Sequence, residues 1–166
     1  IAGMLKEQIE FTRDYQDLGV KSPAWQNLAE VCSHAASQLD MGSVRFVNEA
    51  ANLEVYADPL FEKVVCNIID NALRHGGGVS TIRVWCSSDK GNSTLSIEDD
   101  GVGIPAPDKS RIFDKGFGSH TGYGLFLARE ILAITGMSIR ETGVPGNGAR
   151  FDVLVPKGKF RIRPVS

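Results

Sequence analysis

An apolar stripe on one predicted helix constrains the fold of this 166-residue chain more than any other feature. Asp58 and Pro59 introduce a segment, about residues 60–74, in which apolar side chains recur at uninterrupted helical spacing. The stripe consists of Phe61, Val64, Val65, Ile68, Ile69, Ala72 and Leu73. A helix with such a face must pack against a broad surface, because water would otherwise contact the whole stripe.

Short strand patterns supply a surface of that kind. We predict strands at residues 44–47, 53–57, 81–87, 94–99, 137–141 and 149–155. The first two, joined by residues 48–52, form a hairpin or lie in neighbouring ladders, and residues 89–92 form a turn between the next two. The alternating tail, residues 157–163, favours a further strand over a site for an anionic partner.

Three more helices are predicted from apolar periodicity. The first covers about residues 1–18; the second, capped by Ser22, carries Trp25 on its inner face and ends near Gly42; the third spans residues 124–135. The predicted fold class is therefore α+β. It is a two-layer α/β sandwich, with a mixed sheet of about five strands and about three helices on one face.

Composition limits the classes of protein to which the chain can belong. Hydrophobic residues make up 42% and charged residues 23%, which is typical of a soluble globular domain. A net charge of -2 offers no broad basic field, so nucleic acid is not an expected partner. The cysteines Cys32, Cys66 and Cys86 lack the paired spacing of a zinc site, which favours a reducing, intracellular setting. No apolar run approaches the roughly 20 residues that cross a bilayer.

The polar face of the helix at 60–74 is a first candidate site. Asn67, Asp70, Asn71 and Arg74 follow one another at helical spacing on the side opposite the stripe. An asparagine oxygen is a hard ligand that suits Mg²⁺, and an arginine can counter phosphate charge. Taken alone, this pattern is more typical of an ordinary solvated face.

A second candidate site follows the strand at 94–99. Asp99 ends that strand, and Gly101 and Gly103 come directly after it. The glycines leave room for a flat ring to approach the backbone, and a carboxylate there can accept a hydrogen bond from an exocyclic amine such as that of adenine. An acidic glycine turn without a ligand explains this motif equally well when it is taken alone.

A long loop and a glycine-rich helix start form a third candidate site. Residues 101–121 are rich in Gly, Pro, Asp, Ser and Lys and are too long for a simple connection, which predicts a binding loop or lid. Residues 121–125, Thr-Gly-Tyr-Gly-Leu, then open a helix whose free N–H groups and dipole favour a phosphate. By itself this motif is weak, and a flexible entry turn is its more common explanation.

Taken in order, these elements resemble the ATP-binding catalytic domain of sensor histidine kinases, in the GHKL or Bergerat ATPase superfamily. Residues 67–75, 99–103, 111–117 and 121–125 resemble that family's N, G1, F and G2 boxes. The glycine turn at 146–148 matches its last glycine region. The likeness covers about residues 25–155, and it implies the Bergerat ATP-binding fold with ATP and Mg²⁺ as ligands.

The resemblance also implies roles for individual residues. Asn71 stands at the position that holds magnesium, Asp99 at the one that bonds the adenine amine, and Asn67 and Arg74 beside the phosphates. The implied nucleotide-binding set is Asn67, Asn71, Arg74, His75, Asp99, Gly101, Gly103, Ile104, Lys115, Phe117, His120, Thr121, Gly122, Gly124 and Leu125.

Within that set, the lid residues have separate implied roles. Phe113 and Phe117 anchor the lid, and Lys115 and His120 are phosphate contacts within it. His75 stands where the family often has an aromatic residue, so it is expected to pack near the nucleotide rather than transfer a proton. The sequence departs from the family at His120, where a glycine is usual, and the lid after Phe117 is short, so its motion is expected to be restricted.

Such kinases transfer the γ-phosphoryl group of ATP to a histidine on a separate helical hairpin. None of the three histidines of this chain is followed by Glu or Asp as that histidine normally is; they are His34, His75 and His120. We therefore interpret residues 1–21 as a remnant of the hairpin's second helix plus a linker, and residues 22–166 as the catalytic domain. The chain is expected to bind ATP without phosphorylating itself, and no residue is assigned a catalytic role beyond positioning the nucleotide.

The resemblance implies partners as well. These are ATP, the histidine-containing dimerisation hairpin of the parent kinase, and a response regulator. The parent is expected to be a homodimer, either cytosolic or membrane-anchored, and this part of it is expected to be cytoplasmic and monomeric when isolated.

Two other function classes remain as alternatives. The same nucleotide fold serves GHKL ATPases such as type II topoisomerases and mismatch-repair proteins, and kinases that phosphorylate serine on anti-sigma antagonists. The F box and the helix before Ser22 favour a histidine kinase over these. A non-catalytic regulatory module is the third possibility, and the intact Asn71, Asp99 and Gly101 argue against it.

Overall fold

The computed structural model describes residues 2–50, 52–118 and 123–162. The helices are α1 (Ala2–Asp17), α2 (Leu28–Ser37), α3 (Phe61–His75) and α4 (Gly124–Ala133), with single 3-10 turns η1 (Ala106–Asp108) and η2 (Arg111–Phe113). The strands are β1 (Ala24–Asn27), β2 (Arg45–Glu49), β3 (Leu53–Ala57), β4 (Thr81–Asp89), β5 (Asn92–Asp99), β6 (Ser138–Glu141), β7 (Arg150–Val155) and β8 (Phe160–Ile162). None of the helices in these ranges combines the length and apolarity that spanning a bilayer requires.

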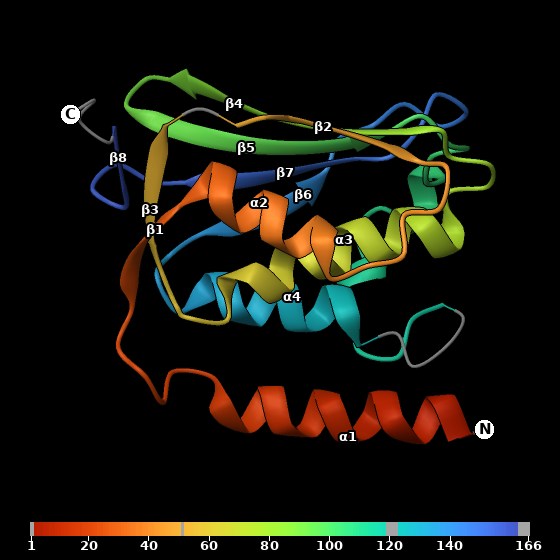
Figure 1. Ribbon diagram of the computed structural model, residues 1–166, viewed down its shortest axis with the longest axis horizontal. Coiled ribbons are helices and arrows are strands. Elements are labelled where there is room, and N and C mark those ends of the chain that lie inside the picture. Colours follow the sequence, from red (N-terminus) through yellow and green to blue (C-terminus); the bar gives the residue numbers. More distant parts are fainter. Residues whose placement is uncertain (1, 51, 119–122, 163–166) are drawn as a thin grey trace.

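Five strands form the main sheet, in the order β2-β4-β5-β7-β6. β2 runs parallel to β4 and the other pairs are antiparallel, so the sheet is mixed, as predicted. At the β4–β5 hairpin, Lys90 and Gly91 both have positive φ, 51° and 82°, as a tight two-residue hairpin turn requires. Figure 1 shows α2, α3 and α4 together on one face of this sheet, which confirms the two-layer arrangement.

The apolar stripe of α3 forms the centre of the core. Phe61, Val64, Val65 and Ile69 are fully buried, and Leu73 packs at the edge of the same cluster. The strands contribute the buried side chains Ile82, Val84, Leu95, Ile97, Phe151 and Val153. Because one face of α3 is committed to this core, its opposite face remains available for polar side chains.

The segment predicted as one helix from Ser22 to Gly42 is two elements. Residues 24–27 form β1, where Trp25 lies opposite Tyr56 of β3, and the helix begins only after it. Asn27 is its N-cap, since its Oδ1 accepts a hydrogen bond from the backbone N–H of Glu30 at 2.9 Å. The prediction was wrong for residues 22–27, because one apolar side chain fits either periodicity and pairing with β3 decides between them.

A second sheet, with the strand order β1-β3-β8, was not predicted. It excludes the hairpin alternative for residues 44–57, because β2 joins the main sheet beside β4 while β3 lies between β1 and β8. The strand predicted in the C-terminal tail is confirmed as β8, antiparallel to β3. Arg161 of β8 reaches across this sheet, with its guanidinium 4.2 Å from the Trp25 ring centroid and its Nε 2.8 Å from Glu54.

Helix α1 lies outside the helix layer, beside α4 (Figure 1). Aromatic rings join the two: Phe11 lies 4.3 Å from Tyr123 and Tyr15 lies 6.3 Å from Phe126, between ring centroids. On its outer side, Ile9 is 65% exposed. The helix thus has one face against the rest of the chain and one apolar face toward solvent.

Candidate functional site

A cavity of about 630 Å³ opens between α3, the start of α4, the segment that follows β5, and α1. This volume lies within the range of small-molecule sites, about 300–1,000 Å³. The predicted site residues that line it are Asn67, Asn71, Arg74, His75, Gly103, Ile104, Phe117, Gly124 and Leu125. Three segments far apart in the sequence therefore meet at one cavity.

Two asparagines of α3 line this cavity, and they differ in whether the side chain is already hydrogen-bonded. Asn67 donates a hydrogen bond from Nδ2 to the backbone carbonyl of Gly124 at 2.9 Å, which joins α3 to the first residue of α4. A Cβ at Gly124 would lie 3.6 Å from Cγ of Asn67, which is an ordinary van der Waals contact, so space alone does not require glycine at this position. Asn71 makes no side-chain hydrogen bond with the described residues, so its carboxamide is available within the cavity. One carboxamide oxygen is a suitable donor for Mg²⁺, which completes its shell with water and phosphate.

Arg74, one turn further along α3, is held by two carboxylates. Its Nε lies 3.0 Å from Asp70, four residues earlier, and its Nη1 lies 3.0 Å from Glu7 of α1. The hydrogen bond with Glu7 is the main cause that raises the pKa of the Arg74 guanidinium. Arg74 therefore stays charged beside the cavity, where an anionic group would compete with Glu7 for it.

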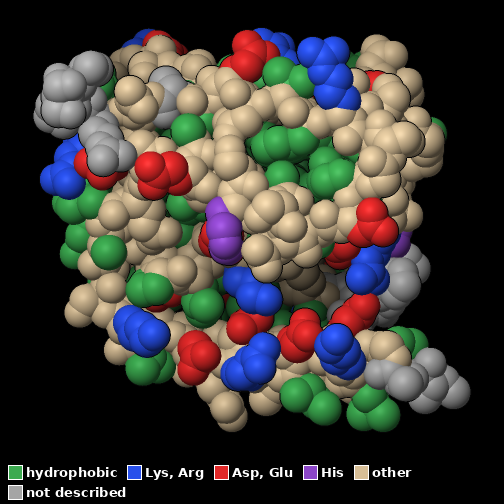
Figure 2. All heavy atoms as spheres, in the orientation of Figure 1, with side chains coloured by type: hydrophobic (Ala, Val, Ile, Leu, Met, Phe, Trp, Pro, Cys, Tyr) green, Lys and Arg blue, Asp and Glu red, His purple; other side chains and the backbone are tan. Residues whose placement is uncertain are grey.

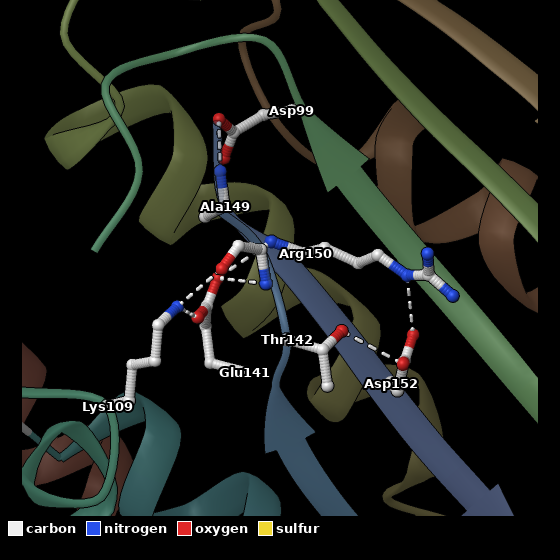
Figure 3. Close-up of polar contacts among 8 residues, drawn as sticks. Asp99, Lys109, Glu141, Thr142, Ala149, Arg150 and Asp152 are labelled. Atoms are coloured by element: carbon white, nitrogen blue, oxygen red, sulfur yellow. Dashed lines mark hydrogen bonds and ion pairs between the residues drawn. The ribbon is translucent and has the colours of Figure 1, made fainter. Parts of the chain in front are cut away.

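Asp99, at the end of β5, is buried, with 6% of its surface exposed. Its Oδ1 accepts hydrogen bonds from the backbone N–H groups of Gly101 at 2.9 Å and Ala149 at 3.2 Å. Figure 3 shows the second of these bonds. Oδ2 accepts none from the described part of the chain. Burial raises the pKa of the Asp99 carboxyl, and these two backbone bonds offset part of the rise. A buried carboxylate with one free oxygen can accept from a ligand's amine, although Asp99 itself is not among the residues that line the cavity.

The residues around Asp99 have structural tasks. Gly101 lies against the end of α3, where a Cβ would overlap the carbonyl oxygen of Gly76. Asp100, next to Asp99, turns the other way: it accepts hydrogen bonds from the backbone N–H groups of Ser80 at 2.8 Å and Thr81 at 3.1 Å and from the Ser80 hydroxyl. The Ser80 hydroxyl is the main cause that lowers the pKa of Asp100. Of the two adjacent carboxylates, only Asp99 therefore keeps an oxygen without a hydrogen-bond partner among the described residues.

The predicted lid divides into an anchored part and a part against α1. Phe113 is buried and meets Phe151 edge to face at 6.2 Å, so the anchoring role predicted for it is consistent with its position. Phe117 lines the cavity, with the Arg111 guanidinium 4.9 Å from its ring centroid. Lys115 does not line the cavity; its Nζ lies 5.6 Å from the ring centroids of both Phe11 and Tyr123. His120, Thr121 and Gly122 lie outside the described residues.

Helix α1 contributes a wall that the sequence did not predict. Glu7, Glu10, Phe11 and Asp14 line the cavity, and Asp14 pairs with Lys63 of α3 at 3.4 Å. Figure 2 shows charged side chains of both signs gathered where α1 meets the helix layer. Sequence reasoning missed these residues because their spacing on α1 is that of any surface helix, and only docking brings them to the cavity.

The comparisons with known proteins agree with this geometry. Residues 57–159 match the family described as histidine kinase-, DNA gyrase B-, and HSP90-like ATPase. The sensor protein KdpD of Escherichia coli (strain K12) is 30% identical over 144 residues, which is 80% of this chain and 16% of KdpD. This chain thus spans about a sixth of that relative's length.

Solved structures share the fold. The catalytic domain of the histidine kinase ThkA, at 25% identity, superposes with a TM-score of 0.69 over 82% of this chain and 97% of that one. Full-length ShkA, solved in complex with AMPPNP, superposes with a TM-score of 0.76 at 18% identity, over 98% of this chain and 36% of ShkA. The family match covers the helix with the polar face, the end of β5 and the lid. The chain belongs to the family of histidine kinase-, DNA gyrase B-, and HSP90-like ATPases, and within it to the ATP-binding catalytic domains of sensor histidine kinases.

Proposed function

We propose that the cavity binds Mg²⁺-ATP and positions its γ-phosphoryl group for transfer to a histidine that lies elsewhere in the parent kinase. The observation that carries this proposal is the meeting of Asn71, Arg74 and Gly124 at one cavity of about 630 Å³. These residues supply a hard oxygen, a fixed positive charge and a helix start to the same space. A triphosphate with a divalent ion is the ligand that uses all three.

In this proposal the two ends of the nucleotide are held by different elements. Asp99 accepts from the 6-amino group of adenine through Oδ2, and the glycines beside it let the ring approach the backbone. Asn71 would hold the metal ion, and a divalent ion at that position would supply positive charge beside the phosphates. Asn67, Arg74 and Gly124 lie beside the phosphates. Phosphate contacts by His120, Thr121 and Gly122, which lie outside the described residues, and by Lys115, which would have to leave the Phe11 and Tyr123 rings, remain part of the proposal. The contribution proposed for this chain is position and electrostatics, because the phosphate acceptor is proposed to lie elsewhere in the parent kinase.

The remaining parts of the reaction belong to the parent protein. Residues 1–21 are proposed to be the end of its dimerisation hairpin and a linker, and residues 22–166 the catalytic domain. The phosphate acceptor is then a histidine on that hairpin, with a response regulator as the next acceptor, in a homodimer whose catalytic part is cytoplasmic. The 18% identical ShkA, solved with AMPPNP, supports the nucleotide part of this proposal by its fold alone.

Calorimetry with ADP and GDP, each with and without Mg²⁺, tests the proposed roles. The wild type is expected to prefer ADP, because guanine presents a carbonyl where adenine presents the amine. Asp99→Asn is expected to lose about tenfold of that preference, since one hydrogen bond to a charged group is worth about 1.5 kcal/mol. Asn71→Ala is expected to lose the gain in affinity that Mg²⁺ brings.

Two matched controls lie at the opposite end of β5. Asp89→Asn and Asn92→Ala make the same chemical changes at the β4–β5 hairpin and are expected to leave both quantities unchanged. A wild-type chain without affinity for adenine nucleotides under any divalent-ion condition would disprove the proposal. Phosphate incorporated into this chain from ATP alone would disprove the separate location of the acceptor histidine.

A further inference from the structure

A buried ion pair lies next to the proposed purine site. The side chain of Glu141, at the end of β6, is fully buried, and its Oε1 accepts from Nζ of Lys109. Its Oε2 accepts from the backbone N–H groups of Gly143 at 3.1 Å and Arg150 at 2.9 Å (Figure 3). Lys109 also donates to the carbonyl of Gly143 at 2.8 Å. A carboxylate that is buried away from water is stable only when its oxygens are paired and hydrogen-bonded, as those of Glu141 are. The Glu141–Lys109 pair is therefore part of the packed structure rather than a chance surface contact.

The backbone that Glu141 holds is the backbone that holds Asp99. Arg150 donates its N–H to Glu141, and the residue before it, Ala149, donates its N–H to Asp99 Oδ1 at 3.2 Å. The N–H of Asp99 returns a hydrogen bond to the Ala149 carbonyl at 2.9 Å. Two successive peptide groups therefore connect the two carboxylates, as Figure 3 shows.

The turn between β6 and β7 packs without slack against this region. A Cβ at Gly148 would overlap the backbone carbonyl oxygen of Asp99. A Cβ at Gly103, which lines the cavity, would lie 2.9 Å from the carbonyl oxygen of Gly148. A shift of this turn would therefore move the backbone on both sides of the purine position.

Lys109 connects this turn to the segment that leads to the lid. It lies between η1 and η2, and its side chain is 23% exposed, whereas that of Glu141 is fully buried. Without it, Glu141 would be an unpaired buried charge close to Asp99. Burial is the main cause that raises the pKa of Asp99, and the negative charges of Asp100 and Glu141 add to it.

We propose that Glu141, neutralised by Lys109, is a positioning residue for purine recognition: it holds the Ala149–Arg150 backbone that orients the Asp99 carboxylate, and so sets the preference for adenine over guanine nucleotides. This inference rests on the proposed function and adds residues to it that touch neither nucleotide nor metal. It assigns the preference for adenine to two carboxylates: Asp99, which contacts the base, and Glu141, which orients Asp99 through the backbone between them.

The test separates purine recognition from phosphate binding in the intact chain. Calorimetry would measure dissociation constants for ADP, GDP and inorganic tripolyphosphate, each with Mg²⁺, for the wild type, Glu141→Gln and Lys109→Met. Both variants are expected to lose about fivefold to tenfold of the ADP-over-GDP preference, the equivalent of about one hydrogen bond. Affinity for tripolyphosphate is expected to stay within about twofold, since the α3 side of the cavity is unchanged.

Conservative and matched variants distinguish positioning from mere stability. Lys109→Arg keeps the charge and is expected to retain the preference. Asp152→Asn removes the neighbouring ion pair with Arg150 on the same strand, 3.0 Å in the wild type, and is expected to have no effect on it. If Glu141→Gln fails to fold, the partly exposed Lys109→Met carries the test.

The outcomes separate this inference from the function on which it rests. Loss of the preference in Asp99→Asn but not in Glu141→Gln or Lys109→Met would overturn the positioning role alone. A parallel loss of ADP and tripolyphosphate affinity would also overturn it, because the pair would then be a general structural support. A wild type that binds tripolyphosphate but does not prefer ADP over GDP would overturn the purine role of Asp99 and this inference together.

Discussion

At the scale of single residues, Asp99 is subject to two opposing requirements. Its carboxylate is useful to a ligand because it is charged and has one oxygen free of partners among the described residues, yet the same charge is costly in a buried position. Both backbone donors reach Oδ1 only. An asparagine could accept the same two bonds without the charge, so the protein retains an acid where a neutral amide would be more stable.

Asp99→Asn is therefore expected to stabilise the chain while it removes purine selectivity. The expected gain at neutral pH is on the order of 1 kcal/mol, or about 2–4 °C in melting temperature for a chain of this size. The pKa of Asp99 is raised in the folded state, so its charge does not destabilise the fold below the pKa of the unfolded state, about 3.9. The destabilisation grows as pH rises from there through the folded-state pKa, and it is fully present above that pKa.

Thermal melting of both proteins between pH 3.5 and 8 checks this expectation. The difference in melting temperature should be largest at neutral pH and should vanish toward the acid end. Asp89→Asn, an exposed carboxylate, is the control and should show no such difference. A variant less stable than the wild type at neutral pH would contradict the argument.

At the scale of secondary-structure elements, the boundary between β1 and α2 decides how the second sheet attaches to the helix layer. Asn27 is both the last residue of β1, opposite Glu54, and the N-cap of α2. The chain therefore changes from strand to helix within one residue, and Leu28 enters the core directly. A single side-chain hydrogen bond secures this change of direction.

Asn27→Ala is expected to destabilise the chain by about 1 kcal/mol, since it leaves the first turn of α2 without its side-chain acceptor. Asn27→Asp keeps an acceptor at the same place and should lose little. Denaturant unfolding of the three proteins measures both differences. Equal loss in the two variants would show that Asn27 acts through another contact than the cap.

At the scale of the whole molecule, α1 is an added layer that closes the cavity from outside. It brings Glu7, Glu10 and Asp14 to a cavity in which we propose that a triphosphate binds. Carboxylates and phosphates repel one another, and Glu7 holds the guanidinium of Arg74 that a phosphate would use. The position of α1 therefore opposes the proposed ligand.

Glu7→Gln is expected to increase the affinity for Mg²⁺-ADP by about fivefold, because a partly exposed ion pair is worth up to about 1 kcal/mol. The gain should shrink at high salt, where such charges are screened. Asp17→Asn, at the exposed end of the same helix and outside the cavity, is the matched control. Calorimetry at two ionic strengths measures the change, and an unchanged or lower affinity would show that α1 does not compete with the nucleotide.

The sequence alone determined the parts of this protein that depend on neighbours along the chain. The periodicity of residues 60–74 defined both the core face of α3 and its polar face with Asn71 and Arg74, because helical geometry links positions only three or four residues apart. The turn at Lys90–Gly91 and the strand end at Asp99 were equally local. The motifs that resemble a known family are of this kind, and the matched family covers the same segments.

Tertiary structure decided everything that depends on contacts between distant residues. Pairing with β3 made residues 24–27 a strand, docking brought Glu7 to Arg74, 67 positions later, and folding joined Lys109 to Glu141, 32 positions apart. A single acidic, basic or tryptophan residue is not part of a sequence pattern from which its contact partner could be predicted. Such contacts are decided by folding, because a charge without a partner costs free energy only where the folded chain excludes water, and a ring gains from contact only where another surface covers it.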